Sequence, residues 1–152
     1  MAETREFKPL KELGTIPLSG TTQIKFYVDE YKGYKYGSIR TFIQGETYTG
    51  PTKSGITMNA GLLEKVVPVL EKLPLEPDTT EDKELARFPK KAGVDLVVRI
   101  TIFRDTTGVD LREWVEDASY KGWSKKGVRI PYKELAQAVS YLKEMRQLIA
   151  KE

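Results

Sequence analysis

The chain repeats itself at a fixed interval, and this repeat limits its fold more than any other feature of the sequence. A shift of 72 residues places residues 24–73 over residues 96–145 without a gap, and eight of the aligned positions are identical. The order of residue types also matches, since Lys53–Ile56 (KSGI) aligns with Lys125–Val128 (KKGV). Self-similar chains are built from copies of one supersecondary unit. We therefore expect two copies of the same unit.

A polar stretch separates the two copies. Residues 74–83 read PLEPDTTEDK, and prolines mixed with acids and threonines are typical of a connecting segment. The sequence predicts a first repeat at residues 14–73, a linker at 74–83 and a second repeat at 84–150. A chain of 152 residues buries about 70% of its unfolded surface, so it needs neither a disulfide nor a metal ion to fold.

Strand-like alternation opens each copy. Residues 96–103 alternate with a period of two, which places each set of side chains on its own face of a sheet. Pro51 and the nearby glycines are expected to break the last strand of the first copy. The further strands are expected at Tyr36–Ile43, Tyr48–Met58, Gly108–Val115 and Tyr120–Ile130, with short strands around residues 16–18 and 85–88.

A helical pattern closes each copy. Asn59 is a good N-cap for the first helix, and Pro68 is expected to kink or shorten that helix. Pro131 suits the first position of the second helix. The apolar residues of the second helix are spaced three and four apart, as in a seam between two helices: Leu135, Ala138, Leu142, Met145 and Ile149. The predicted fold class is α+β, with two ββββα repeats whose curved antiparallel sheets form an intramolecular pseudo-dimer packed through the helices.

The sheet face turned away from the helices has an unusual composition. The apolar face of the first copy holds Ile24, Phe26, Val28, Ile39, Ile43, Ile56 and Met58. The opposite faces then carry Lys25, Tyr27, Tyr31, Arg40, Phe42, Lys53 and Thr57 in the first copy, and Arg99, Thr101, Phe103, Arg112, Trp114, Lys125 and Arg129 in the second. Cations attract phosphates and aromatic rings stack on unpaired bases, so this mixture favours single-stranded nucleic acid.

Structural roles stay open for several of these residues. Arg40 and Arg112 can instead form ion pairs within the protein, with Asp29 or Glu113 as partners. Two glycines, at 55 and 127, allow either a bulge or sharp bend, or the close approach of a ligand backbone. Aromatic pairs also stabilise sheets, and a role in turn or sheet packing is favoured for Tyr34, Tyr36, Tyr48 and Tyr120.

The absent residue types exclude several kinds of chemistry. The chain has no cysteine and no histidine, which excludes thiolate nucleophiles, zinc fingers and Ser-His-Asp triads. Its acids follow no metal-ligand motif, so we expect no metal, no cofactor and no enzyme activity. No apolar run reaches the roughly 20 residues of a membrane span, and the N-terminus lacks a signal peptide's apolar stretch, so an intracellular protein is expected. The net charge of +3 does not by itself indicate a nucleic-acid partner.

Three short motifs resemble the positive-cofactor-four family of transcriptional coactivators. In the first copy they are Asp29–Gly33 (DEYKG), Ser38–Phe42 (SIRTF) and Lys53–Thr57 (KSGIT), in this order before a helix. In the second copy Asp110–Trp114 (DLREW) and Lys125–Val128 are the close matches, whereas the turn at Phe103 has lost its Lys-Gly pair. The resemblance covers most of both repeats.

This resemblance implies a protein that binds single-stranded DNA without catalysis. Members of the family are ββββα units that dimerise through their helices, and their sheets form a channel for two antiparallel strands of DNA. The family's stacking Trp falls on Ile43 and Val115 here, so Phe42 and Trp114, one residue earlier, are the candidate substitutes. The family's other binding positions fall on Tyr31, Lys32, Arg40, Lys53, Ser54, Phe103, Arg104, Arg112, Lys125 and Lys126.

The predicted function is therefore single-stranded DNA binding in transcription, replication or repair, by a monomeric chain. RNA is an open alternative to DNA, and the tandem PUR and Whirly families share the overall plan. A further alternative is an adaptor whose sheets recruit transcription or replication proteins. The full set of candidate binding residues is Lys25, Tyr27, Tyr31, Lys32, Arg40, Phe42, Lys53, Arg99, Phe103, Arg104, Arg112, Trp114, Lys125, Lys126 and Arg129.

Overall fold

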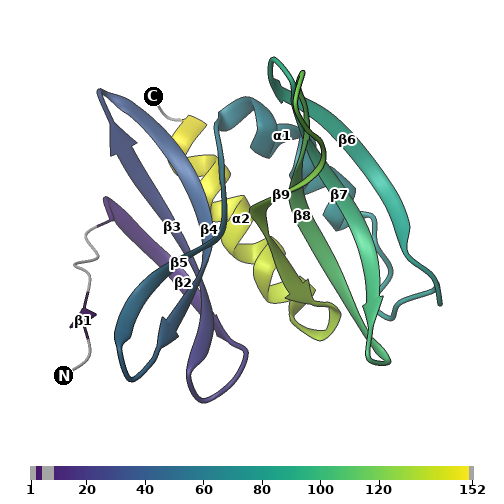
Figure 1. Cartoon of the computed structure of the whole chain (residues 1–152), viewed down its shortest axis with the longest axis horizontal. Coiled ribbons are helices and arrows are strands. Elements are labelled where there is room, and N and C mark those ends of the chain that lie inside the picture. The colour runs from purple at the N-terminus through teal and green to yellow at the C-terminus, as the bar shows by residue number, and fades with distance from the viewer. Residues whose placement is uncertain (1–2, 5–8, 151–152) are drawn as a thin grey trace.

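A computed structural model describes residues 3–4 and 9–150 of the chain, and shows two sheets with a helix pair between them (Figure 1). The first unit comprises β2 (Lys11–Pro17), β3 (Thr22–Tyr31), β4 (Tyr34–Gln44), β5 (Tyr48–Met58) and α1 (Ala60–Glu71). The second comprises β6 (Lys83–Lys91), β7 (Val94–Phe103), β8 (Thr106–Glu116), β9 (Lys121–Pro131), a 3-10 turn (Tyr132–Glu134) and α2 (Leu135–Ala150). The short strand β1 (Glu3–Thr4) pairs in parallel with β5.

The predicted fold class is confirmed: each unit is a four-stranded antiparallel meander followed by a helix. The strand orders are β1-β5-β4-β3-β2 and β6-β7-β8-β9. The 72-residue repeat extends to the pairing register, because Tyr31 faces Tyr34 in one hairpin and Phe103 faces Thr106 in the other. It also includes the irregularities, since β2 slips at Glu12/Gly14 and β6 slips at Glu84/Ala86.

Proline positions differ from the expectations. Pro51 does not break β5, which runs continuously through it with an irregular register. Helix α1 begins after Asn59, whose side chain accepts a hydrogen bond from the Leu62 amide at 2.9 Å, and it continues for three residues past Pro68. Pro131 does not begin α2: it ends β9, where it faces Gly108, and the 3-10 turn follows it. A proline is tolerated there because β9 is an edge strand with a pairing partner on one side only.

The two units share one hydrophobic core. The seam residues of α2 are all buried, with Leu142 fully so, and α2 packs against α1 as expected. Helix α2 also lies against β2, β3 and β4 of the first sheet, where a Cβ on Gly37 would clash with the Met145 sulfur. Helix α1 in turn contacts β6. Each helix therefore covers part of the other unit's sheet.

One expected core residue lies outside this cluster. Ile43 is half-buried, because it lies just after the register shift between Arg40 and Phe42, one residue before the end of β4. Among residues 9–150, no helix is long and apolar enough to span a membrane.

Candidate nucleic-acid interface

The last strand of each unit carries a bulge at the same place. In the first unit Arg40 faces Gly55 while Phe42 faces Pro51, so one residue of β4 lies opposite three of β5. In the second, Arg112 faces Gly127 and Trp114 faces Trp123. Inside each bulge a side-chain hydroxyl accepts a hydrogen bond from a backbone amide. The Thr52 hydroxyl accepts from the Ser54 amide at 3.1 Å, and the Ser124 hydroxyl accepts from the Lys126 amide at 2.9 Å. The bulges are therefore built features that lift Lys53, Lys125 and Lys126 off the regular strands.

An arginine crosses each bulge. Arg40 Nη1 donates to the Thr52 carbonyl at 2.8 Å, and Arg112 Nη1 donates to the Ser124 carbonyl at 3.3 Å. The glycine opposite each arginine makes room for it, since a Cβ on Gly127 would lie 2.8 Å from Arg112 Cγ. Neither glycine is needed for a left-handed turn, so their role is to admit the protein's own arginines.

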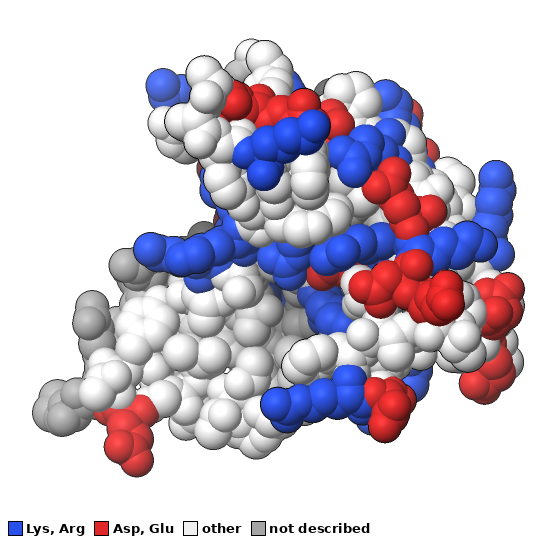
Figure 2. Space-filling model, turned by 45° about the vertical axis from the view of Figure 1, so that its right-hand side comes forward, with Lys and Arg blue, Asp and Glu red and all other residues white. Residues whose placement is uncertain are grey.

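A basic cleft lies where the two bulges meet. It has a volume of about 460 Å³, and strands β5 and β9 contact each other beside it. Among the described residues that line it, the cations are Arg40, Lys53, Lys90, Lys91, Lys125 and Lys126, and Glu113 is the single acid. Lys90 Nζ lies 2.6 Å from the Glu113 carboxylate. Within residues 9–150, the exposed lysines 53, 91, 125 and 126 have no acidic partner. Figure 2 shows Lys and Arg side chains forming a band across one face of the molecule.

The second unit adds two indole rings in contact, each with an arginine beside it, on its open face. Trp114 and Trp123 meet edge to face with centroids 4.8 Å apart. Arg87 lies 5.5 Å from the Trp114 centroid, and Arg99 lies 4.1 Å from that of Trp123. The Trp114 indole also donates to Glu116 at 3.1 Å. Both indoles remain partly exposed.

The corresponding face of the first unit is more closed. Tyr27 and Phe42 are each only 5% exposed, and their rings meet edge to face at 6.2 Å. Lys25 lies over the Phe42 ring and pairs with Glu12 at 2.9 Å. Burial raises the pKa of Tyr27, and it raises the pKa of Asp29 against the opposing charge of Arg40. Phe42 therefore offers far less ring surface than Trp114.

In the second unit, three arginines of the predicted site are held by the protein itself. The buried Asp110 carboxylate accepts from Arg99 and Arg112, each through Nε at 3.1 Å. The internal partner of Arg112 is thus Asp110 rather than Glu113. Arg129 donates to the Thr101 hydroxyl and carbonyl, and to the Thr106 carbonyl. These arginines shape the face and have fewer free donors for a ligand than the cleft lysines.

The hairpin tips carry a matching pair of aromatics and cations. Tyr31 and Phe103 are 64% and 61% exposed. Lys32 lies 5.4 Å from the Tyr31 ring and Arg104 lies 5.2 Å from the Phe103 ring. Both turns have two consecutive residues with positive φ, so the second turn keeps this geometry without a glycine. The β3–β4 and β7–β8 hairpins end at opposite corners of the molecule, and their tips do not line the cleft (Figure 1).

Sequence reasoning missed four residues of this interface. Trp123 was not predicted, because the repeat aligns it with Pro51, which has no aromatic ring. Lys90, Lys91 and Arg87 lie on β6, which was expected only as a short strand around residues 85–88. The packing role favoured for two tyrosines agrees with their hydrogen bonds: the Tyr48 hydroxyl donates to the Pro51 carbonyl and the Tyr120 hydroxyl to the Trp123 carbonyl.

Comparisons with known proteins find a structural similarity but no sequence match. No family model matches the sequence, and no curated protein matches it. The structure is similar to the crystal structure of WHY3 from Arabidopsis thaliana, with a TM-score of 0.47 and 9% identity over 95% of this chain and 91% of that one. A similarity at this level says nothing about function. Among residues 9–150, no group of three acids is placed to hold a metal ion.

Proposed function

We propose that this protein binds single-stranded DNA in the cleft between its two sheets. The observation that supports this most is the convergence of two equivalent bulges, one from each unit, whose lysines have no acidic partners within the described residues. Several unpaired cations close together repel one another, which lowers the stability of the fold, and they attract a polyanion. Glu113, the one carboxylate among the described residues that line the cleft, is neutralised by Lys90.

The two indole rings on the open face of the second sheet support single strands over duplex. Trp114 and Trp123 are held on one sheet face by cations and by each other. An unpaired base can stack on such rings, whereas the bases of a duplex are already stacked. We place the protein with non-catalytic DNA binders of transcription, replication or repair, and we expect it to act as a single chain.

Salt dependence tests the cleft. Binding to a fluorescent oligo(dT) should weaken with salt, with a slope of about −0.7 per phosphate contact. Substituting Lys125→Ala together with Lys126→Ala should weaken binding and flatten the slope by up to about 1.4. The matched control is Lys65→Ala with Lys72→Ala, two exposed lysines that lie outside the cleft. An unchanged slope in the cleft variant, or an affinity independent of salt, would contradict the proposal.

Stacking is tested by removing an indole. Trp114→Ala should weaken binding by roughly 1–3 kcal/mol, because a stacking surface is lost. The salt slope should stay unchanged, because no charge is lost. Phe42→Ala should matter less for binding, since that ring is already covered. If folded Trp114→Ala protein binds oligo(dT) as tightly as the parent, Trp114 is a packing residue.

A further inference from the structure

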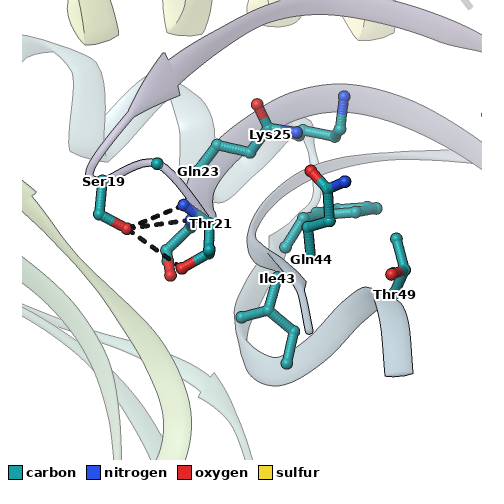
Figure 3. A pocket seen from close by; sticks show the side chains of 11 residues that line it. Ser19, Thr21, Gln23, Lys25, Ile43, Gln44 and Thr49 are labelled. Carbon is teal, nitrogen blue, oxygen red and sulfur yellow. Dashed lines mark hydrogen bonds between the residues drawn. The ribbon is translucent and has the colours of Figure 1, made fainter. Parts of the chain in front are cut away.

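A second cavity opens at the end of the first sheet, away from the basic cleft (Figure 3). It lies between the β2–β3 turn, the end of β4 and the start of β5, and has a volume of about 260 Å³. This volume is just below the usual range of small-molecule sites, so it suits a group no larger than a nucleobase. The side chains that matter here are Gln23, Lys25, Phe42, Gln44 and Thr49.

The polar groups of this cavity have unused hydrogen-bonding capacity. Within residues 9–150, the side-chain amides of Gln23 and Gln44 and the hydroxyl of Thr49 have no hydrogen-bond partner, whereas the Gln44 backbone amide donates to the Thr21 carbonyl at 2.8 Å. The rim, in contrast, is fixed: the Ser19 hydroxyl accepts from the backbone amides of Thr21 and Thr22 at 3.2 and 3.1 Å. Figure 3 shows Ser19 and Thr21 joined on one side and Gln23 and Gln44 on the other. The cavity is therefore shaped in advance and offers donors and acceptors together.

The position of these amides places them on the predicted binding face. Gln23 faces Phe42 across β3 and β4, and Gln44 lies two residues after Phe42 on the same strand. All three side chains thus share the open face with Lys25. A strand of DNA that follows this face would pass over the cavity.

The second unit has no equivalent cavity chemistry. The repeat replaces Gln23 by Asp95 and Gln44 by Glu116. Asp95 pairs with Arg87, and Glu116 accepts from the Trp114 indole and lies 3.8 Å from Lys121. A carboxylate only accepts hydrogen bonds, so Asp95 and Glu116 do not offer the donor and acceptor together that a side-chain amide offers.

We propose that this cavity receives one unpaired base of the bound strand and selects adenine. The inference rests on the function proposed above. A Gln amide pairs bidentately with adenine, donating to N7 while accepting from the N6 amino group. None of the described residues that line the cavity is a carboxylate, so none of them repels the neighbouring phosphates. The protein then binds any single strand through its cleft and prefers strands that bring an adenine to the first unit.

The experiment uses 20-residue oligo(dT) with one central position changed to dA, dC or an abasic site. Anisotropy at one stated salt concentration should show the dA oligonucleotide binding about fivefold more tightly than the other three, the lower end of one bidentate contact. Gln23→Ala with Gln44→Ala should abolish that difference and leave the affinity for unmodified oligo(dT) within about twofold of the parent. The matched control, Gln137→Ala with Gln147→Ala, changes two exposed glutamines of α2 and should keep the preference.

Two failures are distinguishable in this design. If the parent protein binds all four oligonucleotides equally, or if the Gln23/Gln44 variant keeps the preference, the adenine site is wrong while the cleft stands. If the parent binds none of them, the proposed function fails and the adenine site fails with it. A circular dichroism spectrum identical to the parent's shows that the variant is folded.

Discussion

Arg40 and Arg112 lie flat across neighbouring strands because a glycine stands opposite each of them. This contact links one backbone position to the electrostatics of the cleft. With Arg112 in place, its guanidinium reaches both the buried Asp110 and the Ser124 carbonyl. The bulge lysines 125 and 126 then project from a loop whose backbone is already fixed by hydrogen bonds.

Substituting Gly127→Ala should therefore destabilise the fold. The new Cβ would meet Arg112 Cβ, Cγ and Cζ within 2.9 Å, so the whole side chain must move and leave Asp110 with a weaker partner. We expect a loss of about 1–3 kcal/mol in the free energy of unfolding, measured by urea denaturation. Gly20→Ala is the control, because a Cβ there has no neighbour within 4 Å. Equal stability of the two variants would show that Arg112 moves without cost.

The strands of the two units match each other more closely than the side chains they carry. Strands β3 and β7 share bounds and register after the 72-residue shift, and so do β4 and β8. The helices differ: α1 starts directly from an Asn59 cap, whereas a 3-10 turn precedes α2. Both helices still meet along one seam, because pairing them removes the apolar faces of both from water.

Leu142 tests this seam. Leu142→Ala should lower the free energy of unfolding by about 2–5 kcal/mol, because it leaves a cavity among fully buried neighbours. The exposed Gln147→Ala on the same helix should change it by less than about 0.5 kcal/mol. A small effect at Leu142, measured by the same urea titration, would mean that the helices do not form the centre of the core.

At the scale of the whole molecule, the repeats are not independent bodies. The core cluster joins residues of both sheets and both helices, and the Tyr132 hydroxyl donates to the Pro74 carbonyl at 2.6 Å across the connection. Helix α2 packs against the first sheet through Tyr141, whose ring centroid lies 5.1 Å from that of Phe26. Removing either half would expose the surface that the other half covers.

We therefore expect the two halves to fold only together. Fragments 1–77 and 78–152 should each lack the cooperative thermal transition of the parent, and mixing them should restore it. The intact chain should have a mass near 17.3 kDa by light scattering, because its helix seam is already filled within the chain. A fragment that unfolds cooperatively alone as a monomer would show that one unit suffices.

The sequence alone determined the parts of this protein that depend on local pattern. Period-two alternation, the Asn59 cap and the spacing of the seam residues predict strands, helix start and helix pairing, because each signal lies within a few residues along the chain. The 72-residue repeat then supplied the two-unit plan, since the same pattern folds in the same way twice.

The tertiary structure alone decided which side chains the candidate interface brings together. Trp123, Lys90 and Lys91 join the candidate interface through strand pairing and sheet packing, which bring together residues far apart in sequence. In the same way Phe42 is covered and Arg112 is bound to Asp110, although their sequence pattern matches that of exposed binding residues. The exposure and ion pairing of a side chain depend on the residues of the neighbouring strands. The spacing of residues within one strand does not reveal those neighbours.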